Sequence, residues 1–138
     1  MGAFATAGTF EAEAWVNFSS LPSVSQLFAF NGAGGSDGIA VFTESNTLIA
    51  DAKGTTASGK NATIVFSTGH WYHIVIQKTT QQVNKIYVNG VDVTTTGTDY
   101  VLTNSAVNYL GIYDAVDRYP LAGIVDEVRV SNTNRSAD

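Results

Sequence analysis

The sequence predicts an all-β domain, an antiparallel β-sandwich of about ten to twelve short strands. Apolar and polar residues alternate in many segments, whereas no segment longer than about ten residues has a helical period. Clusters of Gly, Asn, Asp and Ser separate the alternating segments. Few apolar runs are continuous, which argues against a parallel α/β sheet.

The clearest strand covers residues 9–18, which read T-F-E-A-E-A-W-V-N-F. Successive side chains of a strand point to opposite faces of a sheet. One face of this strand therefore carries Phe10, Ala12, Ala14, Val16 and Phe18, and the other carries Glu11, Glu13, Trp15 and Asn17.

The same reasoning predicts further strands along the chain. They cover residues 25–31, 38–43, 47–51, 62–67, 71–78, 85–88, 99–102, 108–112 and 122–131. Asn89 and Gly90 stand between two alternating segments and predict a two-residue hairpin, because a type I′ turn needs positive φ at both central positions.

Length and composition indicate one globular domain over residues 1–138 and exclude several partners. The net charge is −5 and the seven basic residues are scattered, so nucleic acid is not an expected partner. No apolar stretch approaches the ~20 residues of a membrane span. Cysteine is absent, which removes disulfides and thiolate chemistry. The N-terminus lacks the pattern of a signal peptide, so we expect either no export by that route or a fragment of a longer chain.

Three segments together resemble a known family. They read F-E-A-E-A-W-V at residues 10–16, W-Y-H-I-V-I at 71–76 with K-I-Y-V-N-G at 85–90, and L-A-G-I-V-D-E-V-R-V at 121–130, followed by Asn132, Arg135 and Ser136. In this order they are similar to the laminin G-like branch of the concanavalin A-like lectin/glucanase superfamily. The resemblance spans residues 10–136.

This resemblance implies a jelly roll of two curved antiparallel sheets. It also implies binding of glycans or proteins, often with calcium, although the related glucanases are enzymes. Family domains usually carry one more strand before the A-W-V strand, and only nine residues precede Phe10 here. That strand is either short, near residues 3–7, or missing, or supplied by a neighbouring chain. A missing strand leaves an open sheet edge, which invites pairing.

Glu11 and Glu13 are the best candidates for a catalytic pair of carboxylates. On a strand they project from one face, roughly 6–7 Å apart at Cβ, whereas retaining glycosidases need carboxyls about 5–5.5 Å apart. The related glucanases present a third acid, but Trp15 and Asn17 follow on this face. We therefore expect a structural or ligand-contacting role on a solvated strand face, with glycoside hydrolysis as the alternative.

Asp126 is the metal candidate, because the resemblance implies a structural calcium near this position. Calcium takes six to eight oxygen ligands, so backbone carbonyls and water must join one Asp. The alternative is that Asp126 or Glu127 pairs with Arg129 or accepts hydrogen bonds from loop amides.

The loop at residues 113–119 is the ligand-binding candidate. It concentrates aromatic rings and charged groups, which can stack on sugars and bond their hydroxyls. The candidate residues are Tyr113, Asp114, Asp117, Arg118 and Tyr119. The alternative is a tight loop whose rings lie on the sheet.

Trp15 and Trp71 would be sugar platforms if they were exposed. The resemblance places both at framework positions, so packing in or near the core is the favoured interpretation. His73 is likewise expected to be a structural histidine with satisfied hydrogen bonds.

These observations predict a non-catalytic recognition module of a surface-exposed protein, binding carbohydrate or acting in adhesion. The expected partner is a glycan or a surface protein, outside the cell or at its surface. One alternative is a structural or decoration protein of a virion, assembling as a homo-oligomer or with a capsid or tail partner through sheet edges. The other is a glycoside hydrolase that uses Glu11 and Glu13.

Overall fold

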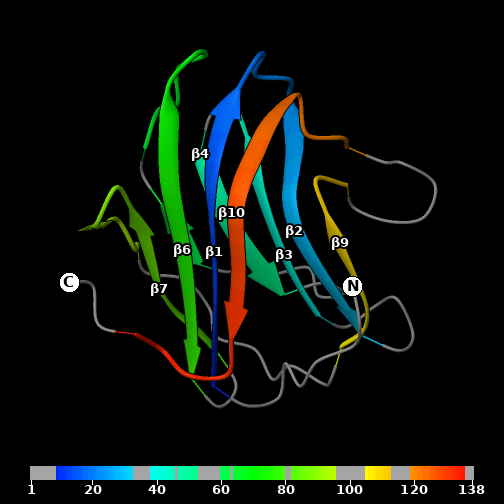
Figure 1. Ribbon diagram of the computed structural model, residues 1–138, viewed down its shortest axis with the longest axis vertical. Helices are drawn as coiled ribbons and strands as arrows, with labels where there is room; N and C mark the ends of the chain where they lie inside the picture. Colours follow the sequence, from blue (N-terminus) through cyan, green and yellow to red (C-terminus); the bar gives the residue numbers. More distant parts are fainter. Residues whose placement is uncertain are drawn as a thin grey trace.

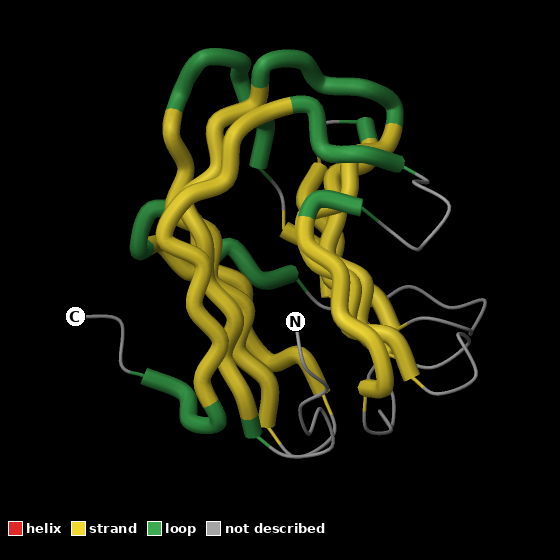
Figure 2. The backbone as a smooth tube through the Cα atoms, turned by 45° about the vertical axis from the view of Figure 1, so that its right-hand side comes forward, coloured by secondary structure: helices red, strands yellow, loops and turns green. Residues whose placement is uncertain are grey.

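In the part of the chain that the structure describes, ten strands form two antiparallel sheets that face each other. The computed structural model describes residues 9–32, 38–45, 47–52, 60–62, 64–79, 82–95, 105–112 and 119–135, and this part of the chain contains no helix. The first sheet has the order β10 (Gly123–Ser131), β1 (Phe10–Phe18), β6 (Trp71–Thr79), β7 (Gln82–Val88) and β8 (Val91–Asp92). The second has the order β5 (Lys60–Ala62), β4 (Thr47–Ala52), β3 (Gly38–Glu44), β2 (Val24–Gly32) and β9 (Ser105–Leu110). Figure 1 views the first sheet in front of the second, and Figure 2 shows the two layers side by side. The predicted antiparallel sandwich is confirmed.

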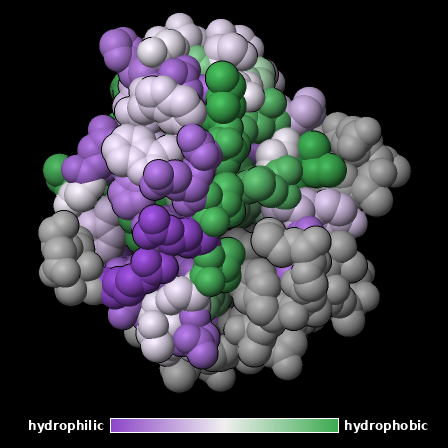
Figure 3. All heavy atoms as spheres, viewed as in Figure 1, coloured by the Kyte–Doolittle hydropathy of each residue, from purple (hydrophilic) through white to green (hydrophobic). Residues whose placement is uncertain are grey.

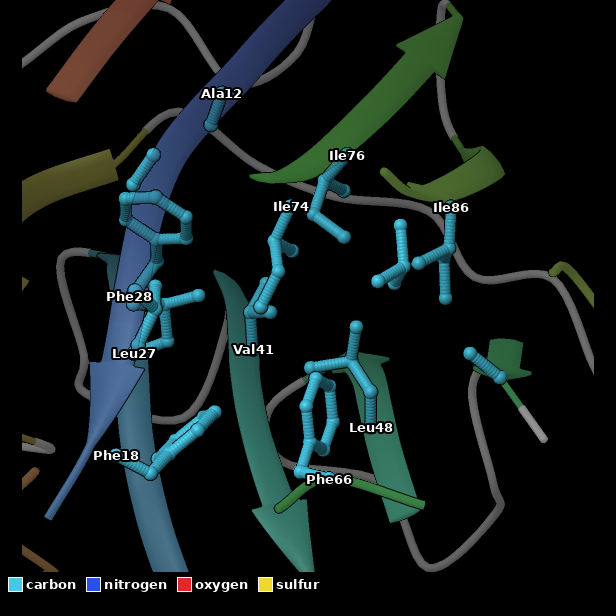
Figure 4. Packing of buried hydrophobic residues seen from close by; sticks show 14 of the residues in the cluster. Ala12, Phe18, Leu27, Phe28, Val41, Leu48, Phe66, Ile74, Ile76 and Ile86 are labelled. Carbon is cyan, nitrogen blue, oxygen red and sulfur yellow. The ribbon is translucent and has the colours of Figure 1, made fainter. Parts of the chain in front are cut away.

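The core fills the space between the sheets. The apolar face of β1 points inward, and its five side chains are at most 1% exposed. They meet aromatic and aliphatic side chains from both sheets, among them Phe28, Val41, Leu48 and Ile74 (Figure 4). Burying such side chains contributes about 1.5–3 kcal/mol each to the free energy of folding. The alternation in the sequence therefore predicted the inward face of β1 correctly.

Lys78 lies on the inward face of β6, at the end of the core. Its side chain is fully buried, and its ammonium group is 5.7 Å from the centre of the Phe10 ring. Burial disfavours the charged form and lowers the pKa of Lys78 from 10.5 to about 8.

The predicted hairpin at Asn89 and Gly90 is confirmed. Both residues have positive φ, 52° and 78°, and they connect β7 to β8. This is the backbone that a type I′ turn requires. The Asn89 side chain adds a contact, because its Oδ1 accepts a hydrogen bond from the His73 amide at 2.9 Å.

The strand predicted at residues 62–67 is wrong at residues 64–67. Ala62 ends β5, and the Ile64 amide donates a hydrogen bond to the Ala62 carbonyl at 3.0 Å. Residues 64–67 are irregular, yet Phe66 is 2% exposed and packs edge-on against Tyr72. The strand predicted at residues 99–102 lies outside the described residues.

A β-bulge interrupts the pairing of β10 with β1. Glu13 pairs with Arg129 and Trp15 with Asp126, so two residues of β10 stand opposite one residue of β1. Glu127, one of the two, has a φ of 49°. The extra residue keeps Val125 and Val128 both packed against the core, which strict alternation would not allow.

Each sheet ends on strands that pair on one side within the described part of the chain. In the first sheet these are β10 and β8. Residues 3–7, one of the alternatives for an additional N-terminal strand, lie outside the described residues. Among the residues described, no helix is long and apolar enough to cross a bilayer.

Candidate functional site

The outward face of the first sheet gathers the polar and aromatic side chains of β1, β6 and β10. The strand register places them in rows: Ser131, Glu11 and Gln77; Arg129, Glu13 and Val75; Asp126, Trp15 and His73; and Ile124, Asn17 and Trp71. Figure 3 shows this face, with hydrophilic side chains over β1 and β6 and an apolar strip along β10. The face therefore combines charge with accessible apolar surface.

An open hollow on this face is lined by Trp15, Trp71, Asp126 and Glu127 and has a volume of about 340 Å³. Trp15 is 37% exposed and Trp71 is 43% exposed, so both indole rings present surface to solvent. The two carboxylates are also exposed. Aromatic surface together with a few polar groups is the usual composition of a small-ligand site.

The β-bulge brings both carboxylates to the hollow. In a regular strand Asp126 and Glu127 would point to opposite faces. The positive φ of Glu127 turns the backbone so that both side chains reach the outer surface. The Glu127 amide donates a hydrogen bond to Asp126 Oδ1 at 2.8 Å, which fixes the Asp126 carboxylate.

Gly123 brings the start of β10 close to β1. A Cβ atom at this position would lie 2.3 Å from the Asn17 carbonyl oxygen, a distance at which the backbone must shift. Only glycine permits the two strands to come this close. Gly123 directly precedes Ile124, which pairs with Asn17 in the same row as Trp71.

A chain of side-chain contacts links Trp15 to its neighbours on the same face. Its indole stacks on the His73 imidazole, with ring centroids 5.0 Å apart and planes at 25°. His73 Nε2 is 3.1 Å from Glu13 Oε2, and Glu13 Oε1 is 3.2 Å from Arg135 Nη1 and 3.5 Å from Arg129 Nη1. The role of His73 as a structural residue with hydrogen-bond partners agrees with its predicted role.

Glu11 and Glu13 are buried, at 3% and 9% exposure, and the expectation of a solvated strand face is wrong. The C-terminal residues cover them. The Arg135 amide donates to Glu11 Oε2 at 2.9 Å, and Gln77 Nε2 donates to the same oxygen at 2.8 Å. Asn134 helps to hold this segment, because its amide group donates to the Phe10 carbonyl at 2.8 Å once its side chain is oriented to satisfy its bonds. These contacts place both carboxylates in a structural network.

The structure places one residue of the predicted binding loop. Tyr119 is 48% exposed with a φ of 54°, and its carbonyl accepts a hydrogen bond from the Gln26 amide of β2 at 2.9 Å. It therefore borders the second sheet and does not line the hollow. Tyr113, Asp114, Asp117 and Arg118 lie outside the described residues, so a site in this loop stays a prediction.

Asp126, the predicted calcium ligand, is exposed at the hollow beside Glu127. The described residues contain no group of three or more His, Asp or Glu side chains that could hold a metal ion. Two carboxylates supply fewer oxygens than the six to eight that calcium takes. Backbone carbonyls and water would have to supply the remaining oxygens, and calcium at Asp126 stays a prediction. Of the alternative pairings, Glu127 Oε2 is 3.9 Å from Arg129 Nη2.

The expectation that Trp15 and Trp71 pack in or near the core is wrong. The place of Glu127 in the lining of the hollow was not predicted. The alternation of β1 already placed Trp15 on the face opposite the core residues. Antiparallel pairing with β6 then puts Trp71 beside Asn17 on the same outward face. The spacing of Val125, Val128 and Val130, three residues and then two, is the sequence signal for the bulge.

The fold and the site together define a two-sheet β-sandwich with an aromatic and acidic hollow on one outer face. The family model described as the concanavalin A-like lectin/glucanases superfamily matches residues 2–138. The chain belongs to this superfamily, and its resemblance to laminin G-like domains is confirmed. No curated protein sequence matches the chain.

Solved structures of low sequence identity share the fold. A putative carbohydrate binding protein from Bacteroides ovatus is 17% identical with a TM-score of 0.70, covering 99% of this chain and 42% of that one. Domains LG4-5 of the mouse laminin alpha1 chain are 16% identical with a TM-score of 0.68, covering 95% and 39%. A Trypanosoma rangeli sialidase is 18% identical with a TM-score of 0.75, covering 95% and 22%. The chain thus spans less than half of each of these three structures, and the similarity shows the fold alone.

Proposed function

We propose that this domain is a non-catalytic carbohydrate-binding module that binds a sugar in the Trp15–Trp71 hollow. The observation that carries the proposal is the pairing of two exposed indole rings with two exposed carboxylates around one open hollow. The C–H face of a sugar ring can stack on an indole, and its hydroxyls can donate hydrogen bonds to Asp126 and Glu127. The similarity to a structure described as a putative carbohydrate binding protein supports the proposal.

The hydrogen bonds and ion pairs of Glu11 and Glu13 support a non-catalytic role for these two residues. A glycosidase needs a carboxylic acid and a second carboxylate that can reach the scissile bond. Here Glu11 accepts hydrogen bonds from Gln77 and Arg135, and Glu13 lies within ion-pair distance of Arg129 and Arg135. A panel of polysaccharides tests this part: turnover that disappears in Glu13→Gln would establish the hydrolase alternative.

The binding site is tested by calorimetry on a sugar selected from a glycan array. Trp15→Ala and Trp71→Ala should each weaken binding about tenfold, because each removes one stacking surface. Trp15→Phe should retain most of the affinity. Val65→Ala is the matched control, since Val65 is 77% exposed and does not line the hollow.

The loop at residues 113–119 is the alternative location for the sugar-binding site. If Tyr119→Ala abolished binding while both tryptophan substitutions left it intact, the site would belong to the loop at residues 113–119. Loss of binding in the tryptophan variants alone would favour the hollow.

We further propose that the domain acts outside the cell or at its surface, where glycans or surface proteins are its partners. The similarity to laminin domains supports this location. Calcium at Asp126 is tested by calorimetric titration with calcium chloride, and heat that persists unchanged in Asp126→Asn would exclude that residue as a ligand. Assembly through sheet edges, as a homo-oligomer or on a virion, stays a prediction, and light scattering that shows a strict monomer at high concentration would contradict self-assembly.

A further inference from the structure

We infer that the hollow prefers a sugar that carries a free ammonium group, a hexosamine unit without its acetyl group, over neutral or acidic sugars. This inference rests on the proposed function and names the ligand class of the same site. It follows from the charges around the hollow and from the chemistry of its walls.

Asp126 offers a carboxylate without a basic partner among the described residues. One of its oxygens, Oδ1, accepts a hydrogen bond from the Glu127 amide. Glu127 Oε2 is 3.9 Å from Arg129 Nη2, at the outer limit of an ion pair. Both carboxylates line the hollow, so a bound cation would meet two negative charges that are only weakly compensated.

The basic side chains beside the hollow already face other carboxylates. Arg129 Nη1 is 3.5 Å from Glu13 Oε1, and Arg135 lies 3.2 Å from Glu13 and 3.4 Å from Glu11. The outer face thus carries four carboxylates and two guanidinium groups in this region, and the chain as a whole has a net charge of −5. An acidic sugar would meet an excess of negative charge here.

The aromatic walls favour the same ligand. An ammonium group over an indole face is attracted by the ring electrons, most strongly for tryptophan. A hexosamine can present a C–H face to one indole and its ammonium group to the other ring or to Asp126. A neutral sugar can stack in the same way and donate hydroxyl hydrogen bonds, but it has no positive charge to place over a ring or beside a carboxylate.

A matched pair of ligands tests the inference. Oligomers of glucosamine and of N-acetylglucosamine have the same sugar backbone and differ at the nitrogen, which is a protonated amine in the first and a neutral acetamide in the second. In calorimetry at low salt we expect the glucosamine oligomer to bind about tenfold more tightly. The preference should shrink at 0.5 M salt, because exposed charges are screened, and at a pH where the amine is deprotonated.

Substitutions at the hollow test whether its carboxylates cause the preference for the glucosamine oligomer. Asp126→Asn and Glu127→Gln should each reduce the ratio of the two affinities by about threefold, since each removes one exposed charge. Glu44→Gln is the matched control, because Glu44 is an exposed carboxylate at the end of β3 in the second sheet. It should leave the ratio unchanged.

The outcomes separate the two proposals. Equal affinity for both oligomers, with binding still dependent on Trp15, would overturn the inference and leave the proposed function standing. Tighter binding of an acidic oligomer such as oligogalacturonate would do the same. No binding of any sugar at millimolar concentration would overturn the proposed function and the inference with it.

Discussion

The indole ring of Trp15 stacks on the imidazole ring of His73 in a nearly parallel arrangement. The exposed tryptophan is therefore held on one side by its cross-strand neighbour, and part of its surface lines the hollow. A ring that is already oriented loses less conformational entropy when a ligand binds. His73 is in turn held by Glu13 through its side chain and by Asn89 through its backbone amide.

His73→Ala should weaken sugar binding about three- to tenfold, because Trp15 loses the ring on which it stacks. His73→Phe should retain most of the affinity, since a phenyl ring can replace the stacking surface. Calorimetry measures both affinities, and the tryptophan fluorescence of the free protein reports whether Trp15 becomes more solvated. Equal affinity of His73→Ala and the wild-type protein would contradict a positioning role.

Glu11→Ala should lower the free energy of unfolding by about 2–3 kcal/mol, because it leaves the Gln77 and Arg135 donors without their acceptor. It should also release the C-terminal segment. Limited trypsin digestion followed by mass spectrometry should then show faster cleavage after Arg135. Glu44→Ala serves as the control with an exposed carboxylate, and an unchanged cleavage rate in Glu11→Ala would argue against this anchor.

Glu127→Gly should raise the free energy of unfolding by about 1 kcal/mol, because glycine adopts a φ of 49° without the cost that a side chain imposes. Glu127→Val should lower it, since branching at Cβ is poorly tolerated there. Urea denaturation measures both changes. Glu44→Gly, in an ordinary strand conformation, should be destabilising, and a destabilised Glu127→Gly would mean that the carboxylate outweighs the strain.

Lys78 should make the stability depend on pH in the alkaline range. Its pKa is about 8 in the folded protein and 10.5 when exposed. Between these values the unfolded chain binds more protons than the folded chain, so the free energy of unfolding should rise with pH across this window. Urea denaturation at several pH values should show that Lys78→Met loses this rise.

Lys85 provides a comparison of opposite sign. Its hydrogen bond to Asp92 raises the pKa of Lys85. Its contribution to the free energy of unfolding is therefore fully present below pH 10.5 and is lost as the pH rises further. Lys85→Met should therefore keep the rise between pH 8 and 10.5. A similar slope in the wild-type protein and in Lys78→Met would refute the assignment to Lys78.

Local patterns in the sequence predicted most of the fold. The alternation in β1 identified which side chains enter the core, and Asn89 with Gly90 identified a turn, because both features depend on the residues of one segment. The end of β5 after Ala62 was not predictable in this way. Phe66 is apolar and buried, but it reaches the core from irregular backbone.

The candidate site was harder to predict because it is assembled from three strands. The burial of Glu11 and Glu13 depends on Arg129 and Arg135, which lie more than a hundred residues further along the chain. The exposure of Trp15 followed from its place in the alternation, but the framework positions implied by the family pointed to the core. The adjacent carboxylates of Asp126 and Glu127 share a surface only because of the bulge.

The bulge has a further consequence for how this protein behaves at high concentration. Within the described residues β10 is the outermost strand of its sheet, and such a strand can recruit extended chains from other molecules into fibrils. The inserted residue breaks the regular spacing of the backbone donors and acceptors with which another strand would pair. The charged side chains of Asp126, Glu127 and Arg129 further disfavour such pairing. The bulge that brings Asp126 and Glu127 to one surface should thereby also disfavour edge-to-edge pairing of β10.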